Sequence, residues 1–204
     1  IINGFNLIDG INGLSSGVAI LASITFGVWF ILEGDYHFAA IPFLLTGSLI
    51  AFFRFNVFSK KNRIFLGDTG ALSIGLIIAV IAVRFLESDY AWIPETADSA
   101  PAITFGVLIV PMFDTLRVFI LRVFDGESPF NADRKHIHHR LLDLGYSHFR
   151  SSMMIMGANL LFIVIVILFR DLGNLKLIFI TLVLATVLSY IPMHMLYKRT
   201  GIIP

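Results

Sequence analysis

The stretch Leu14–Leu32, which reads LSSGVAILASITFGVWFIL, contains no charged residue. A helix needs roughly 20 apolar residues to cross the hydrocarbon core of a bilayer. Over the whole chain 57% of residues are hydrophobic and 14% are charged, and the mean hydropathy is +0.85. A soluble core of this size cannot bury so much apolar surface. We therefore predict an all-α, polytopic membrane protein with six transmembrane helices, near Leu14–Leu32, Phe38–Phe53, Ala71–Phe85, Ile103–Phe124, Met153–Phe169 and Leu175–Tyr197.

Composition also excludes several classes of protein. The formal net charge of +1 is too small to suggest a nucleic-acid partner. The absence of cysteine excludes disulfides, iron–sulfur clusters and thiolate zinc sites. Residues 1–13 are polar and glycine-rich, unlike a signal peptide. Because the chain opens at Ile1 inside a dense motif, we expect residues 1–204 to be one membrane-embedded domain, the C-terminal part of a longer protein.

Basic residues alternate between the connections that join the predicted helices. By the positive-inside tendency, the basic connections and the N-terminal segment face the cytoplasm. Three polar clusters then fall on that side, and a single cytoplasmic site is expected. The basic residues concerned are Arg54, Lys60, Lys61, Arg63, Arg117, Arg122, Arg134, Lys135, Arg140, Arg150, Lys198 and Arg199.

The first cluster opens the chain as Asn3-Gly4-Phe5-Asn6-Leu7-Ile8-Asp9-Gly10. In a continuous helix, Asn3, Asn6 and Asp9 would share one edge with Gly10, Gly13 and Gly17, within about 120° of arc. Such an edge would offer hard oxygen ligands or uridine-type hydrogen bonds beside a surface without side chains. The alternative is that the Asp-Gly and Asn-Gly pairs form turns and the later glycines only pack helices.

The second cluster, Phe65-Leu66-Gly67-Asp68-Thr69-Gly70, places one carboxylate directly before an apolar helix. Asp68 could serve as an N-cap that accepts backbone N–H groups of the first turn. A helix N-terminus that faces the cytoplasm also attracts phosphate, and a carboxylate there can hold a divalent cation that bridges to it. The two interpretations are compatible.

The third cluster packs three imidazoles and three cations into residues 134–140. Arginine and lysine hold phosphate oxygens, and imidazoles donate to or shuttle protons at a phosphoryl group. A patch that only touches anionic lipid headgroups would need no histidine. A zinc site would lack cysteines and a clear fourth ligand. We therefore expect an anionic ligand at Arg134, Lys135, His136, His138, His139 and Arg140.

One further carboxylate, Asp114, lies inside an apolar run, where a charged group is costly and by default functional. Arg117 follows three residues later and could neutralise it on the same helix face. The sequence is compatible with a structural ion pair between Asp114 and Arg117 and equally with a role of Asp114 in the site.

In this order, the three clusters resemble the polyprenyl-phosphate N-acetylhexosamine-1-phosphate transferases, of the glycosyltransferase family 4 type. That family shows an Asn-x-x-Asn-x-x-Asp-Gly segment, a Phe-x-Gly-Asp-Thr-Gly segment and a histidine-rich cytoplasmic loop, which match Asn3–Gly10, Phe65–Gly70 and His136–His139. The His-Ile-His-His-Arg-Leu-Leu form is similar to the undecaprenyl-phosphate N-acetylglucosaminyl 1-phosphate transferase branch, which starts teichoic acid and O-antigen-type glycans.

The resemblance implies transfer of N-acetylglucosamine 1-phosphate, or a related N-acetylhexosamine 1-phosphate, from a UDP-sugar to undecaprenyl phosphate, with release of UMP. It implies a Mg²⁺ cofactor, with Mn²⁺ as the alternative ion, and a location in the bacterial inner membrane, and is compatible with a homodimer. Asp68 and Asp9 would be the metal ligands. The implied catalytic residues are Asp9, Asp68, His136, His138 and His139, and the implied substrate-binding residues are Asn3, Asn6, Phe65, Arg134 and Arg140.

This sequence also departs from the family pattern. The family's Asp-Asp pair in an earlier cytoplasmic loop has no counterpart here, and neither do about four preceding helices. Asn12 stands where many members have a second aspartate, and the loop before Phe65 lacks the usual proline, which leaves the match at Asn56 open. Two alternatives follow: a catalytically silent fragment of the family, or a membrane transporter.

Overall fold

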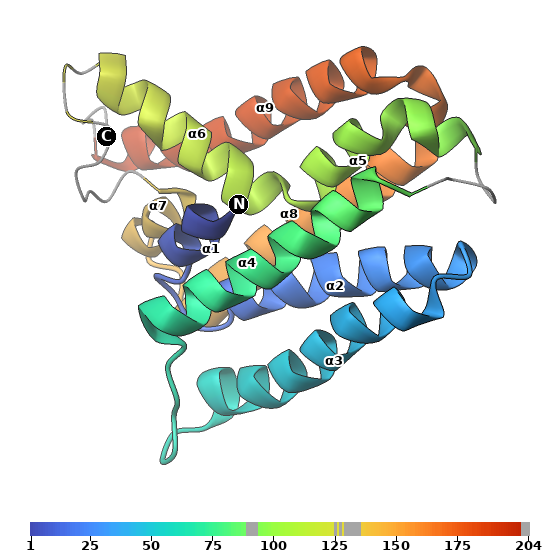
Figure 1. Cartoon of the computed structure of the whole chain (residues 1–204). Coiled ribbons are helices and arrows are strands. Elements are labelled where there is room, and N and C mark those ends of the chain that lie inside the picture. The colour runs from blue at the N-terminus through green and yellow to red at the C-terminus, as the bar shows by residue number, and fades with distance from the viewer. Residues whose placement is uncertain (89–93, 125, 127, 129–135, 201–204) are drawn as a thin grey trace.

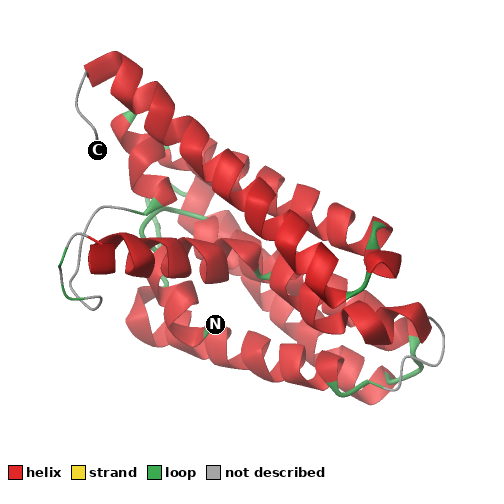
Figure 2. Cartoon of the chain, turned by 90° about the horizontal axis from the view of Figure 1, so that it is seen from above, coloured by secondary structure: helices red, strands yellow, loops and turns green. Residues whose placement is uncertain are grey.

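The computed structural model describes residues 1–88, 94–124, 126, 128 and 136–200. In these residues the chain forms helices joined by turns, and no strand occurs among them (Figure 2). The predicted all-α class is confirmed. The α-helices are α1 (Ile2–Ile8), α2 (Leu14–Leu32), α3 (Tyr36–Phe53), α4 (Gly67–Leu86), α5 (Ala100–Val107), α6 (Ile109–Phe124), α7 (Ile137–Asp143), α8 (His148–Leu168) and α9 (Asn174–Thr200).

Three short elements complete the described chain. A π-helical turn, η1 (Arg54–Phe58), continues α3, while the 3₁₀ turns η2 (Pro94–Ser99) and η3 (Arg170–Leu172) precede α5 and α9. Within the part of the chain that the structure describes, five helices are long and apolar enough to cross a membrane: α2, α3 with η1, α4, α8 and α9. They correspond to five of the six predicted crossings.

The sixth predicted crossing, Ile103–Phe124, is present as two helices, α5 and α6, which meet at Leu108. Pro111 explains the break, because it has no N–H to donate to the carbonyl of Val107 and its ring crowds that carbonyl. The freed Val107 oxygen accepts a hydrogen bond from Nδ2 of Asn159 in α8, at 3.3 Å. Beyond the break, α6 runs away from α5 in a new direction (Figure 1).

The short helix α1 is held by its neighbours. A helix of seven residues is marginal by itself in water. Phe5 and Ile8 are completely or almost completely buried. Gly4 lies against the backbone of Pro111, and Gly75 of α4 lies against the backbone of Ile2, so that an added Cβ would collide at either glycine. These close approaches fix α1 between α4 and α6.

The elements that carry the three sequence clusters lie at one end of the bundle. There, α1, α7 and the start of α4 come together, and the last turn of α9 lies nearby (Figure 1). We call this end the site end. The turn between α2 and α3 lies at the opposite end, where Arg84 binds Asp35 at 2.7 Å and Asp35 caps α3 by accepting from the Phe38 N–H.

Candidate active site

The first two clusters meet through their side chains. Nδ2 of Asn6, on α1, donates to Oδ1 of Asp68, in the first turn of α4, at 3.1 Å. The two residues are 62 positions apart in the chain. The structure therefore places the opening amides beside the Phe65–Gly70 segment.

The first cluster is not one continuous helix, so the predicted single edge from Asn3 to Gly17 is wrong. α1 ends at Ile8 and α2 begins at Leu14. Gly13 has a φ of +81°, which glycine adopts without strain. Its N–H donates to Oδ1 of Asn56 at 2.7 Å instead of continuing a helical ladder. The turn reading was correct for this segment, and an added Cβ at Gly17 would overlap Met156, as expected of a packing glycine.

Asp68 is not the N-cap of α4. Leu66 occupies the cap position and Asp68 lies within the first helical turn. Its carboxylate is exposed to solvent and bound to Asn6, so it is available to a ligand. Phe65, three residues earlier, exposes 75% of its surface, and its stacking on uracil stays a prediction.

Asp9 and Asp68 form a pair of neighbouring carboxylates. Burial, and then the negative charge of Asp68, raises the pKa of Asp9 to about 6. Among the described residues, no group of three or more histidine, cysteine or acidic side chains could hold a metal ion. Mg²⁺ is commonly bound through one or two carboxylates, with water and phosphate oxygens completing its shell. Asp9 and Asp68 fit that kind of site, and their predicted role as metal ligands remains untested.

The histidine cluster lies at the N-terminus of α7, next to the first cluster. His138 is almost fully buried, and its Nε2 lies so close to Gly10 that a Cβ there would overlap it. Within the described chain, neither ring nitrogen of His138 has a hydrogen-bond partner. Burial, and then the neighbouring His139, lowers the pKa of His138 to about 4. Without a ligand this imidazole is therefore uncharged at neutral pH, and its ring N–H can donate a hydrogen bond to a phosphate oxygen.

A buried carboxylate anchors the start of α7. Oδ2 of Asp114 lies 2.9 Å from Nδ1 of His136, and Oδ1 accepts from the Ile137 N–H at 3.1 Å. Arg117 binds the same Oδ1 at 3.1 Å. The predicted Asp114–Arg117 pair is thus present. Sequence reasoning did not predict the contact between Asp114 and His136. The position of the Asp114 carboxylate inside an apolar run was the signal that could have indicated it.

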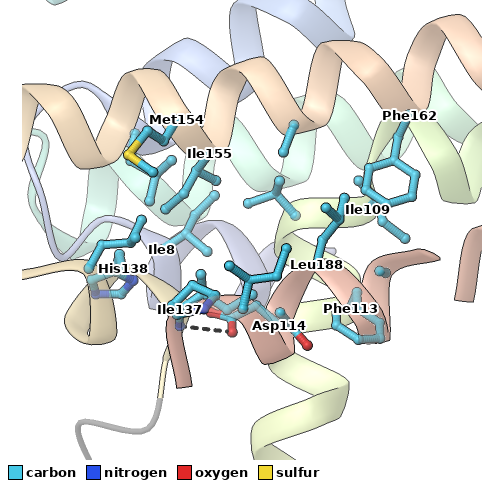
Figure 3. A pocket seen from close by; sticks show the side chains of 18 residues that line it. Ile8, Ile109, Phe113, Asp114, Ile137, His138, Met154, Ile155, Phe162 and Leu188 are labelled. Atoms are coloured by element: carbon cyan, nitrogen blue, oxygen red, sulfur yellow. Dashed lines mark hydrogen bonds between the residues drawn. The ribbon is translucent and has the colours of Figure 1, made fainter. Parts of the chain in front are cut away.

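An apolar cavity of about 230 Å³ adjoins this anchor. Its walls come from α1, α2, α6, α7, α8 and α9, and the only polar side chains among its lining residues are Asp114, His138 and Ser189. Figure 3 shows the Ile137 N–H bound to Asp114, with His138 to one side of this pair and the apolar side chains of Ile109, Phe113 and Phe162 farther along the cavity on the other. A hydrocarbon chain could therefore lie beside the polar groups of the site.

The remaining predicted site residues occupy different settings. Asn3 is exposed on α1, one turn before Asn6. His139 and Arg140 are half-buried on α7, and the rings of His138 and His139 are 4.2 Å apart. Arg134, like Lys135, lies outside the described residues. The individual roles of all these side chains stay predictions.

The contact between Gly10 and His138 yields a first testable prediction. Gly10→Ala should displace the His138 ring, because the new methyl group and Nε2 cannot share the same space. We expect about a tenfold or greater loss of the activity proposed below, measured as initial rate, with about 1–3 kcal/mol lost in folding free energy. Gly157→Ala on α8 is the matched control, since nothing lies within 4 Å of a Cβ there. Equal rates for the two variants would contradict the packing argument.

Fold and site together define a multi-pass membrane protein with a polar site at one end of its helix bundle. Residues 1–86 match the model of glycosyl transferase family 4. This confirms the resemblance predicted from the motifs. No solved structure matches the chain.

Curated relatives are named for related activities. The decaprenyl-phosphate N-acetylglucosaminephosphotransferase of Mycobacterium leprae is 30% identical over 168 residues, which are 76% of this chain and 42% of that protein. The enzyme of the same name from Mycolicibacterium smegmatis is 32% identical, over 76% of this chain and 41% of that protein. A probable undecaprenyl-phosphate N-acetylglucosaminyl 1-phosphate transferase of Bacillus subtilis is 28% identical, over 98% and 57%. The chain thus spans about half the length of these relatives.

Proposed function

We propose that this chain carries part of the site of a transferase that moves N-acetylglucosamine 1-phosphate, or a related N-acetylhexosamine 1-phosphate, from a UDP-sugar to undecaprenyl phosphate. The observation that carries the proposal is the junction of Asn6, Asp9 and Asp68 at the same end of the bundle as His138. Carboxylates, an amide and imidazoles in one place suit a pyrophosphate with its divalent cation. The names of the relatives support the sugar and the lipid.

In the proposed reaction, an oxygen of the lipid phosphate forms a bond to the sugar-bearing phosphorus of the UDP-sugar. The bond from that phosphorus to the bridging oxygen breaks, and the oxygen leaves with UMP. The product is a lipid-linked pyrophosphoryl sugar. No proton has to be removed from an ionised lipid phosphate, so the side chains act mainly by positioning and by charge neutralisation.

The protein groups have separate tasks in this scheme. Asp9 and Asp68 would hold Mg²⁺, or Mn²⁺ as an alternative, which when bound would neutralise charge on the phosphates. Neutral His138 would donate a hydrogen bond to a phosphate oxygen, and Phe65 would stack on uracil. The apolar cavity beside His138 supports a prenyl chain as the tail of the acceptor. Basic connections at the site end support a cytoplasmic orientation of the site.

The test uses membranes that contain the full-length protein. UMP release from UDP-N-acetylglucosamine should require both added Mg²⁺ and undecaprenyl phosphate, and omission of either should reduce it to background. The released nucleotide is measured by chromatography. UMP release that does not depend on the lipid would overturn the proposed acceptor. Solute or ion flux into liposomes without a nucleotide sugar would instead favour the transporter.

A further inference from the structure

One buried side chain links the two segments that carry the proposed metal ligands. Asn56 lies in the π-helical turn η1 at the end of α3 and exposes only 5% of its surface. Its Oδ1 accepts from the N–H of Gly13 at 2.7 Å, and its Nδ2 donates to the carbonyl of Ile64 at 2.8 Å. Both partners are backbone groups, so Asn56 fixes the course of the chain on each side.

The two partners border the candidate site. Gly13 closes the turn that begins at Asp9, and Ile64 precedes Phe65 and the start of α4, where Asp68 lies. The separation of the two carboxylates therefore depends on two things: the packing of α1 on α4 through Ile2 and Gly75, and the way this turn sits against the segment before α4. Asn6 and Asp68 also join the two segments, but that hydrogen bond is exposed to solvent and therefore weaker as a constraint.

A carboxamide has the chemistry for this link, because it has one acceptor and one donor arm in a single plane. Aspartate could accept from Gly13 but, when ionised, has nothing to donate to Ile64. Leucine of similar size would leave both backbone groups without their side-chain partner. A wider π-helical turn in place of a regular α-helical one is often found at functional sites.

We propose that Asn56 is a positioning residue, which holds the Asp9–Gly13 turn against the Ile64–Asp68 segment and so sets the distance between the Asp9 and Asp68 carboxylates. The inference rests on the proposed function for its catalytic consequence. Its structural content can be tested separately. Asn56 itself need not contact a substrate.

The key variant is Asn56→Asp, which keeps the size and the acceptor but replaces the donor with a charged oxygen facing the Ile64 carbonyl. Asn62→Asp is the matched control, because it adds the same charge at an exposed position in the same connection. Asn56→Ser, a smaller side chain with one hydroxyl, is the second variant if Asn56→Asp does not accumulate in membranes.

Two readouts are compared. The chain has no cysteine of its own, and any cysteine elsewhere in the full-length protein is replaced by serine, so spin labels can be attached through Asn12→Cys in the turn and Arg63→Cys just before Ile64. In the full-length protein without metal, Asn56→Asp should broaden the distribution of distances between the labels, and Asn62→Asp should leave it unchanged. In unlabelled protein, Asn56→Asp should lower the rate of UMP release about tenfold or more and raise the Mg²⁺ concentration for half-maximal rate.

The outcomes separate the two hypotheses. An unchanged distance distribution in Asn56→Asp overturns the positioning role, even if activity falls. A broadened distribution with an unchanged rate and unchanged Mg²⁺ dependence overturns the catalytic consequence. If the wild-type protein releases no UMP, the proposed function fails, while the label distances still decide whether Asn56 holds the two segments together.

Discussion

Replacement of Asp68 by alanine should reduce UMP release at least about 100-fold, because one of the two carboxylates proposed to hold the cation beside the pyrophosphate is then missing. The side chain is exposed and its bond to Asn6 lies at the surface, so folding should be little affected. The rate is measured in membranes with the full-length protein, at equal amounts of wild type and variant.

The matched control is Asp171→Ala, an exposed carboxylate in η3 at the opposite end of the bundle. It should leave the rate unchanged. A second readout needs no activity: in metal-free protein, Asp68→Asn should lower the pKa of Asp9 from about 6, since the negative charge of Asp68 is removed. The pKa should stay above its ordinary value, because burial is the larger cause. Full turnover in Asp68→Ala would remove the basis for the proposed site.

Replacement of Asp114 by alanine should cost about 3–5 kcal/mol of folding free energy, the range found when one partner of a buried ion pair is deleted. The change removes the acceptor of the Ile137 N–H and of His136, and deprives Arg117 of this carboxylate. We also expect UMP release to be lost, since α7 would no longer be anchored with its histidines at the site. Thermal unfolding in detergent and the initial rate are measured together.

Asp114→Asn separates stability from positioning. The amide oxygen can still accept from Ile137 or Arg117, so most of the packing should survive, but the carboxylate that accepts from Nδ1 of His136 and fixes its tautomer is gone. Activity should therefore fall more than stability. Asp35→Ala is the control at the opposite end. There the partly exposed pair with Arg84 and the cap of α3 together contribute about 1–2 kcal/mol, and the change should not affect the rate. Stability losses of equal size at the two ends would contradict the assignment.

Much of the fold was predictable from local composition. The five long apolar helices follow from runs of apolar residues. Each residue has its own preference for lipid, so the hydropathy summed along the chain is enough to locate these helices. The break between α5 and α6 was missed, although Pro111 signals it, because the apolar run is continuous across the break. The helix from Asn3 to Gly17 was predicted as continuous because spacing alone does not reveal that Gly13 donates to Asn56.

For the candidate site, the sequence proposed the members but could not predict their contacts. The three clusters and their placement on the same side followed from motif order and from the alternation of basic connections. The hydrogen-bond partners of Asp68, His136 and Gly13 could not be predicted in this way. Each of these contacts joins residues between 22 and 62 positions apart, and at such separations many pairings are compatible with the same pattern.

The sequence by itself thus determined that the chain is a helical membrane protein, which residues are the candidates for its chemistry, and the family whose pattern its first part matches. Only the tertiary structure decided that Asn6 meets Asp68, that His138 lies against Gly10, and that Asp114 holds α7. The physical reason is that partition into lipid and helix formation depend on neighbours along the chain. Hydrogen bonds and ion pairs between helices depend instead on atoms approaching within about 3 Å, which packing alone determines.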